Sequence, residues 1–151
     1  MALEVGKKAP DFTLLDENGE KVKLSHFKGK RVVVFFYPKA MTSGCTREAC
    51  DFRDEVDAFK RKDAVVLGIS KDPPAVQKRF KEKYQLPFPL LSDESTEVQQ
   101  AWGVWGEKNM YGKKILGTIR TTVVIGPDGK VEQVFPKVKV DGHVADVLGS
   151  L

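Results

Sequence analysis

The two cysteines are the residues of this chain whose type and spacing most clearly suggest chemistry. Cys45 and Cys50 are the only cysteines among 151 residues, and they lie where the sequence pattern changes. The preceding residues, 31–37, are apolar and rich in β-branched side chains, which is typical of a strand buried on both faces. After Cys45, apolar residues recur at steps of three and four, which is helical spacing; they are Ala49, Phe52, Val56 and Phe59. This pattern places Cys45 in the first turn of a helix that follows a central strand.

A thiol in that position is easily converted to a reactive thiolate. The first turn of a helix presents unpaired backbone N–H groups and the positive end of the helix dipole, and both favour an anion. Thr42, three residues before Cys45, could offer a hydroxyl to the same pocket. Pro38, whose φ is locked, could cover the site and fix the path of the chain as it leaves the strand.

Cys50 follows Cys45 by five residues, and this spacing has a mechanical consequence. In a regular α-helix five residues correspond to a rise of about 7.5 Å and a rotation of about 140°, so the two Cα atoms are about 8.7 Å apart. Disulfides usually need Cα atoms within about 7 Å of each other. A Cys45–Cys50 bridge therefore requires the first turn or two of the helix to unwind.

The spacing alone leaves other interpretations open. Two cysteines on one helix could equally be small core residues. A zinc site is less favoured, because the spacing is not Cys-x-x-Cys and neither His26 nor His143 falls at ligand spacing. A thiol–disulfide oxidoreductase would also be expected to carry Cys-x-x-Cys.

The elements around the cysteines predict an α/β fold. We expect an N-terminal hairpin about Asn18-Gly19 and a helix from the cysteine motif to about Arg61. The remaining expected elements are strands at 31–37, 64–70, 121–125 and 130–135, helices opening at 72–74, 95 and 141–143, an extended segment at 87–91 and a long loop at 106–117. This order favours a thioredoxin-like sandwich, a central mixed β-sheet flanked by helices, as one domain spanning residues 1–151. A doubly wound dinucleotide fold fits less well, because no Gly-x-Gly-x-x-Gly follows the first buried strand.

Composition argues against several classes of function. The net charge is +4, but 25 basic and 21 acidic residues are interspersed, as on a solvated surface and unlike a stripe that tracks nucleic acid. The longest apolar run, residues 32–37, is too short to cross a bilayer. No secretory signal is visible at the start, so we expect a cytoplasmic protein.

Several motifs, in order along almost the whole chain, resemble one protein family. The segment PKAMTSGC at residues 38–45 has the P-x-x-x-T-x-x-C pattern of peroxiredoxins, and TREACDFRD at 46–54 resembles the bacterioferritin-comigratory protein branch, also called peroxiredoxin Q. Further similarity lies in APDF at 9–12, SD at 92–93, MYGKK at 110–114, GTIRTT at 117–122 and GPDGK at 126–130.

The resemblance implies a thiol peroxidase that reduces hydrogen peroxide and alkyl hydroperoxides without a metal or other cofactor. It implies that Cys45 is the peroxidatic nucleophile and Cys50 the resolving thiol, which forms an intramolecular disulfide. It further implies that Thr42 and Arg120 complete the peroxide site, that Pro38 shields it and that Glu48 supports it. Thioredoxin is the implied reductant, and an intramolecular resolving cysteine is consistent with a monomer.

Two features depart from the branch or remain unassigned. Ser43 stands where the branch commonly has proline, which removes a rigid residue before the active turn. Trp102 and Trp105 are expected to pack in the core or on the surface, with a lip for apolar hydroperoxides or a docking surface as the alternative. Two rival functions also remain, namely a redox-sensing or holdase-like binding protein and a plain thioredoxin-like interaction domain.

Overall fold

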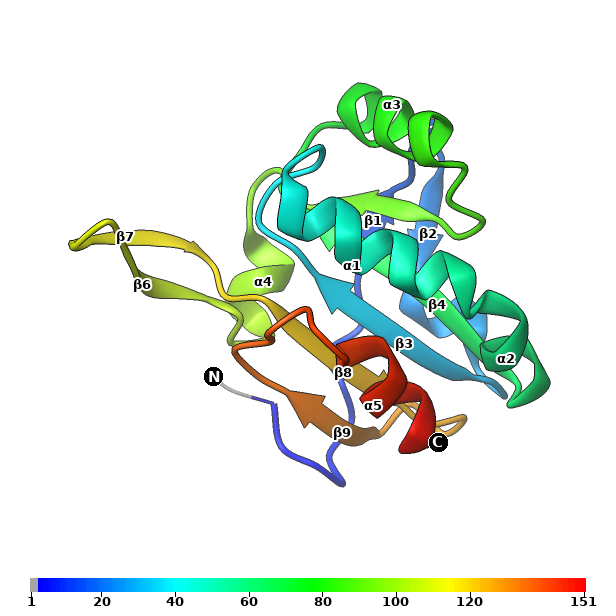
Figure 1. The fold of residues 1–151 in the computed structure, drawn as a ribbon. Helices are drawn as coiled ribbons and strands as arrows, with labels where there is room; N and C mark the ends of the chain where they lie inside the picture. Colours follow the sequence, from blue (N-terminus) through cyan, green and yellow to red (C-terminus); the bar gives the residue numbers. More distant parts are fainter. Residues whose placement is uncertain (1–2) are drawn as a thin grey trace.

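A seven-stranded mixed β-sheet forms the centre of the computed structural model, which describes residues 3–151. The strand order is β2-β1-β5-β4-β3-β8-β9, and a separate two-stranded sheet, β6–β7, projects from the body (Figure 1). The strands are β1 (Thr13–Leu15), β2 (Lys21–Lys23), β3 (Arg31–Phe36), β4 (Ala64–Ser70), β5 (Leu90–Ser92), β6 (Trp105–Met110), β7 (Lys113–Thr118), β8 (Thr121–Ile125) and β9 (Val131–Phe135). The helices are the 3-10 helix η1 (Leu24–Phe27) and the α-helices α1 (Ser43–Asp54), α2 (Val56–Arg61), α3 (Pro74–Tyr84), α4 (Glu97–Ala101) and α5 (His143–Gly149).

Strand directions follow from the connections between them. Helices separate β3, β4 and β5, and these three strands run parallel to one another. Strand β8 pairs with β3 in the antiparallel sense, and the hairpin to β9 continues that edge. The N-terminal hairpin β1–β2 is antiparallel and joins the other edge through β5. The expected mixed sheet, with an N-terminal hairpin, is confirmed.

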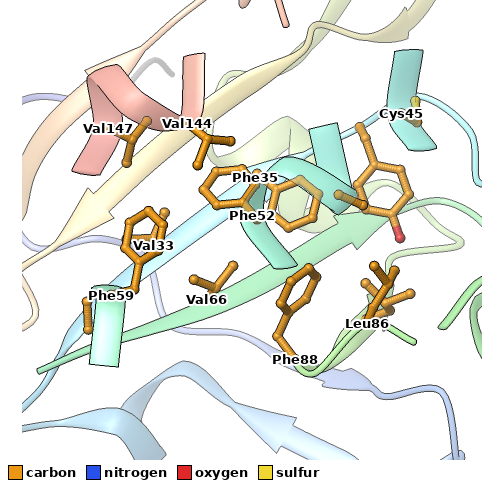
Figure 2. Packing of buried hydrophobic residues seen from close by; sticks show 14 of the residues in the cluster. Val33, Phe35, Cys45, Phe52, Phe59, Val66, Leu86, Phe88, Val144 and Val147 are labelled. Carbon is orange, nitrogen blue, oxygen red and sulfur yellow. The ribbon is translucent and has the colours of Figure 1, made fainter. Parts of the chain in front are cut away.

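The two faces of the sheet carry separate hydrophobic cores. Successive β3 side chains point to opposite faces, so Val33, Phe35 and Tyr37 meet one layer of helices and Val32, Val34 and Phe36 the other layer. The first core includes buried side chains from α1, α2, α3 and α5, as Figure 2 shows for Phe52, Phe59, Val144 and Val147. The second core is closed by α4, η1 and the N-terminal segment, and the buried Trp102 packs there against Phe12 and Phe36.

One glycine in β4 permits the aromatic packing of the first core. Gly68 lies opposite Phe35 in the parallel ladder. A Cβ atom at this position would lie 2.9 Å from both Phe35 Cζ and Leu90 Cδ2 and 3.1 Å from Tyr37 Cε1, closer than side chains tolerate. The absent side chain therefore lets Phe35 stack on Phe52 with ring centroids 4.7 Å apart.

Two expectations about local structure are wrong. The helix after the cysteine motif is not continuous to Arg61, because Glu55, with φ −108° and ψ 8°, separates α1 from α2. The segment expected as a long loop at 106–117 is instead the β6–β7 hairpin. Its two-residue turn, Tyr111-Gly112, has positive φ at both positions (53° and 78°), as a type I′ hairpin turn requires.

In residues 3–151, no helix has both the length and the apolar character that a membrane span requires.

Candidate active site

The turn between β3 and α1 places Cys45 at the edge of the first core. Thr42 is the N-cap residue of α1, with an extended backbone (φ −77°, ψ 155°), and Cys45 is the third helical residue. The Thr46 amide already donates to the Thr42 carbonyl at 2.9 Å, so the first turn is formed. Cys45 is buried, with only 1% of its surface exposed to solvent, and Figure 2 shows it at one end of the packed cluster. Its predicted position in the first helical turn is confirmed.

Arg120 reaches Cys45 from the neighbouring strand. It lies in the short connection between β7 and β8, directly before Thr121, which pairs with Phe36 at the end of β3. Because α1 begins just beyond the end of β3, this pairing brings Arg120 to the first turn of the helix. Its Nη2 donates to Cys45 Sγ at 3.2 Å, while its Nη1 donates to Glu48 Oε1 at 2.7 Å. One guanidinium therefore bridges the thiol and the carboxylate.

Burial and charge set the electrostatics of this group. Burial raises the pKa of Glu48 to about 7, although the charge of Arg120 and its hydrogen bond act in the opposite direction. Burial lowers the pKa of Arg120, but the negative charges of Glu48 and Cys45 outweigh it, and the net shift is upward. Arg120 thus stays cationic beside the sulfur. The Glu48 carboxylate offsets the cost of burying this guanidinium, and the ion pair fixes the guanidinium beside Cys45.

Thr42 and Pro38 lie in the same turn as Cys45. Within residues 3–151, neither of them forms a hydrogen bond with Cys45 Sγ. The Thr42 hydroxyl donates to the Lys39 carbonyl at 2.7 Å and is exposed, while Pro38 is half-buried directly after β3. The structure therefore brings together Cys45, Glu48 and Arg120, and it places Thr42 at the rim of this group.

The turn is anchored by a residue that the sequence analysis did not single out. Asp72 follows β4 and accepts a hydrogen bond from the Ala40 amide at 2.8 Å and one from the Ser70 hydroxyl at 2.7 Å. Parallel strands end at the same edge of a sheet, so an acidic residue just after 64–70 could have been expected beside the loop after 31–37. Asp72 holds the backbone that leads into α1.

Cys50 is half-buried and lies on the same helix as Cys45, and both thiols are free. Burial chiefly raises the pKa of Cys50; Arg53 opposes the shift, and Asp54 and Asp51 add to it. Cys50 is thus predominantly a neutral thiol at neutral pH. Both cysteines lie within the continuous helix α1, so the condition for a bridge is the unwinding that the five-residue spacing predicts.

Gly44 lies against Arg120, and β6 contributes Lys108 and Trp105. A Cβ atom at Gly44 would lie 3.4 Å from Arg120 Nη2, so the guanidinium passes over this glycine. Burial, and then the charge of Arg120, lower the pKa of Lys108 in β6, while Cys45 acts in the opposite direction. Trp105 lies half-buried under the Lys71 ammonium, which is 5.8 Å from the ring centroid. Trp102, by contrast, belongs to the second core, as the packing interpretation expected.

Among residues 3–151, no group of three or more His, Cys, Asp or Glu side chains is placed to hold a metal ion.

Comparison with known proteins identifies the family. The AhpC/TSA family profile matches residues 5–134. Peroxiredoxin Bcp of Bacillus subtilis is 47% identical over 151 residues, covering 100% of this chain and 96% of the relative, and peroxiredoxin Bcp of Escherichia coli is 49% identical over 149 residues, covering 99% and 96%. The solved structure of the Xanthomonas campestris bacterioferritin comigratory protein, studied for its alkyl peroxide reduction activity, has a TM-score of 0.90 and 36% identity, covering 97% of this chain and 96% of that one. The seven-stranded sheet and its helices are thus a thioredoxin-like peroxiredoxin fold, and the chain belongs to the AhpC/TSA family, in its Bcp or peroxiredoxin Q branch.

Proposed function

We propose that this peroxiredoxin reduces hydrogen peroxide and alkyl hydroperoxides through Cys45, with Cys50 as the resolving thiol. The observation that carries the proposal is the Arg120 bridge, in which one guanidinium donates to Cys45 Sγ at 3.2 Å and to Glu48 at 2.7 Å. A cation fixed beside a thiol at the start of a helix favours the thiolate, which is the nucleophilic form.

The first step transfers one oxygen to sulfur. The Cys45 thiolate attacks the terminal peroxide oxygen, the S–O bond forms and the O–O bond breaks, and the electron pair leaves with the departing hydroxide or alkoxide. Cys45 becomes a sulfenic acid, and the leaving group takes up a proton to form water or an alcohol. Charge moves from sulfur towards the departing oxygen, so Arg120, held in place before the reaction by Glu48, is suited to stabilise it. Thr42 at the rim could donate once its hydroxyl turns from Lys39.

The second step uses Cys50. Its thiol attacks the Cys45 sulfenic acid, the S–S bond forms and water leaves. Because Cys50 is protonated at neutral pH and lies about 8.7 Å from Cys45 on an ideal helix, this step awaits local unwinding of α1. A dithiol protein of the thioredoxin type then restores both thiols by disulfide exchange, supplying two electrons and two protons.

The proposed cycle can operate in a reducing compartment and within a single chain. Two cysteines are too few for a disulfide scaffold, and the proposed cycle needs its bridge to be reduced again, so we place the protein in a reducing compartment, the cytoplasm. The resolving thiol lies in the same helix as Cys45, so one chain contains both thiols and a monomer suffices.

The test is peroxide consumption by the purified protein with thioredoxin, thioredoxin reductase and NADPH. We expect turnover of hydrogen peroxide by the wild type and none by Cys45→Ser. Cys50→Ser should consume one equivalent and then stall. Turnover by Cys45→Ser would remove Cys45 from the mechanism, and oxidation of the wild type without turnover would favour a redox sensor instead.

A further inference from the structure

A buried network of hydrogen bonds connects helix α3 to the turn that precedes Cys45. The Tyr37 hydroxyl donates to Gln77 Oε1 at 2.5 Å, and Gln77 Nε2 donates to the Ser70 hydroxyl at 2.9 Å. The Ser70 hydroxyl in turn donates to Asp72 Oδ2 at 2.7 Å. Tyr37, Ser70 and Gln77 are each 0% exposed. The donors of this network follow one another towards Asp72, whose carboxylate is the final acceptor.

The side chain of Gln77 holds this network in one arrangement. The Gln77 amide group also donates to the Leu91 carbonyl at 2.9 Å, so Nε2 has an acceptor for each of its two hydrogens. The Asp72 amide donates back to Ser70 Oγ at 3.2 Å. A buried polar network whose members are satisfied in this way is rigid, because each lost bond would leave a polar group without water. Gln77 in α3 thereby fixes the orientation of the Asp72 carboxylate.

Asp72 joins the network to the backbone of the active-site turn. Its Oδ2 accepts a hydrogen bond from the Ala40 amide at 2.8 Å. At the beginning of the same segment, the Tyr37 amide donates to the Ile69 carbonyl of β4 at 3.1 Å. The segment 37–40 is therefore tied to the end of β4 at both of its ends.

This tie matters because the next residue has an unfavourable backbone. Met41 adopts φ 70°, which a residue other than glycine reaches only against steric resistance, and it leads directly to Thr42, the N-cap of α1. Such a conformation persists only where the surrounding structure holds it. The bond to Asp72 fixes Ala40 on one side of Met41, and the Thr42 hydroxyl closes the turn by donating to the Lys39 carbonyl at 2.7 Å. Release of Ala40 would let Met41 relax, and the start of α1 would shift with it.

The start of α1 is thus held from the two strands that flank β3 in the sheet. On the β8 side, Arg120 contacts Cys45 and Glu48. On the β4 side, Asp72 holds Ala40. Figure 1 shows the loop from β3 leading into α1, between these two contacts in the sequence of elements. A peroxide must be aligned with both the sulfur and the guanidinium, and a small displacement of reacting groups is costly in rate.

We propose that Asp72 is a positioning residue for peroxide reduction, an inference that rests on the proposed function of Cys45. Oriented by Ser70 and Gln77, Asp72 holds the turn that sets the Cys45 sulfur against Arg120. It acts through the backbone and takes part in no proton or electron transfer. Its effect is confined to the first step, because the second step proceeds from an unwound α1 and does not need the assembled turn.

The test separates the two steps in single-turnover reactions with hydrogen peroxide, followed by tryptophan fluorescence and by the mass of quenched samples. Oxidation of Cys45 depends on peroxide concentration, whereas disulfide formation does not, so the two rates separate as peroxide is varied. Asp72→Ala should slow oxidation at least about tenfold and change disulfide formation less than about threefold. Asp72→Asn should keep oxidation within about threefold of the wild type, because one amide oxygen can accept from both Ala40 and Ser70. The charge is not needed, since no basic side chain among residues 3–151 forms an ion pair with Asp72.

Asp93→Ala is the matched control. Asp93 also follows a parallel strand and accepts backbone amides, but these belong to Val98 and Gln99 of α4, which packs on the other face of the sheet. Asp93→Ala should lower Tm and change the rate of Cys45 oxidation less than about threefold.

The outcomes distinguish this role from lost stability and from the proposed function. Oxidation at the wild-type rate in Asp72→Ala, or slow oxidation in Asp72→Asn, would overturn the positioning role while leaving the peroxidase proposal in place. Equal slowing by Asp72→Ala and Asp93→Ala, or equal slowing of both steps, would overturn it as well. Failure of the wild type to react with peroxide would instead refute the proposed function. If Asp72→Ala does not fold, Ser70→Ala removes the hydroxyl that orients Asp72 and should slow oxidation about fivefold; a wild-type rate there would overturn the role.

Discussion

Oxidation of the two cysteines should melt the first turns of α1. In the reduced protein the Thr46 amide bonds to the Thr42 carbonyl, and the helix continues without interruption to Asp54. Bringing Cys50 from about 8.7 Å to within about 7 Å of Cys45 requires the turns between them to open. The amides of residues 46–50 then lose five backbone hydrogen bonds, each worth about 1 kcal/mol net.

The expected size of the effect follows from this count. Together the five bonds amount to about 5 kcal/mol, apart from the lost burial of Cys45 and Ala49, which are 1% and 0% exposed. At about 1.4 kcal/mol per factor of ten, that corresponds to roughly 4,000-fold protection of these amides against exchange. Disulfide formation should remove most of this protection, because the open state becomes the resting state.

Hydrogen–deuterium exchange with mass spectrometry would measure the change. The wild type is compared before and after one equivalent of peroxide, and Cys50→Ser treated in the same way is the matched control. We expect lost protection over residues 42–52 only in the oxidised wild type, since the control forms a sulfenic acid but no bridge. Unchanged protection in a sample whose bridge is verified by its mass would refute the reasoning about helix geometry.

Three further predictions concern the Arg120–Glu48 pair and the start of α1. Arg120→Lys lacks the planar fork that donates from Nη1 to Glu48 and from Nη2 to Cys45, so single-turnover oxidation by hydrogen peroxide should slow about 100-fold; a rate within threefold of wild type would exclude the bridge as the activating feature. Glu48→Gln should keep most of the activity, because its amide oxygen can still accept from Arg120. The raised pKa of Glu48 means that the native state holds its proton more tightly, so wild-type stability should fall by about 3 kcal/mol as pH rises from 4.5 to about 7. Denaturant titrations should show this fall missing in Glu48→Gln, and equal pH dependence in both proteins would contradict it. Ser43→Pro should raise Tm by about 1–4 °C and slow disulfide formation, since Ser43 is the first residue of α1 and the extended Thr42 tolerates a following proline; a lower Tm would be the opposing result.

The main elements of this fold follow from local patterns in the sequence. The alternation in β3, the helical steps after Cys45 and the turn between β8 and β9 each depend on neighbouring residues, and each is found in the structure. The β6–β7 hairpin escaped this reasoning because its strands are largely exposed and lack an apolar face. Gly112 is a local turn signal in the sequence, but the positive φ of Tyr111 beside it is uncommon for a non-glycine residue, so a two-residue turn was not expected here.

The site itself depends on contacts between distant segments. The position of Cys45 at a helix start could be predicted, but 75 residues separate it from Arg120. That contact comes from the pairing of β8 with β3, which no spacing in the sequence reveals, and the family resemblance supplied it instead.

The most direct test of the central claim is the mass of the protein after one equivalent of hydrogen peroxide, measured with and without alkylation of free thiols. If Cys45 is the nucleophile and Cys50 resolves it, the wild type should lose the mass of two hydrogens and resist alkylation at both thiols. Cys50→Ser should instead gain one oxygen, and that oxygen should be on Cys45. A wild type that keeps two alkylatable thiols, or oxygen added first to Cys50, would contradict the mechanism.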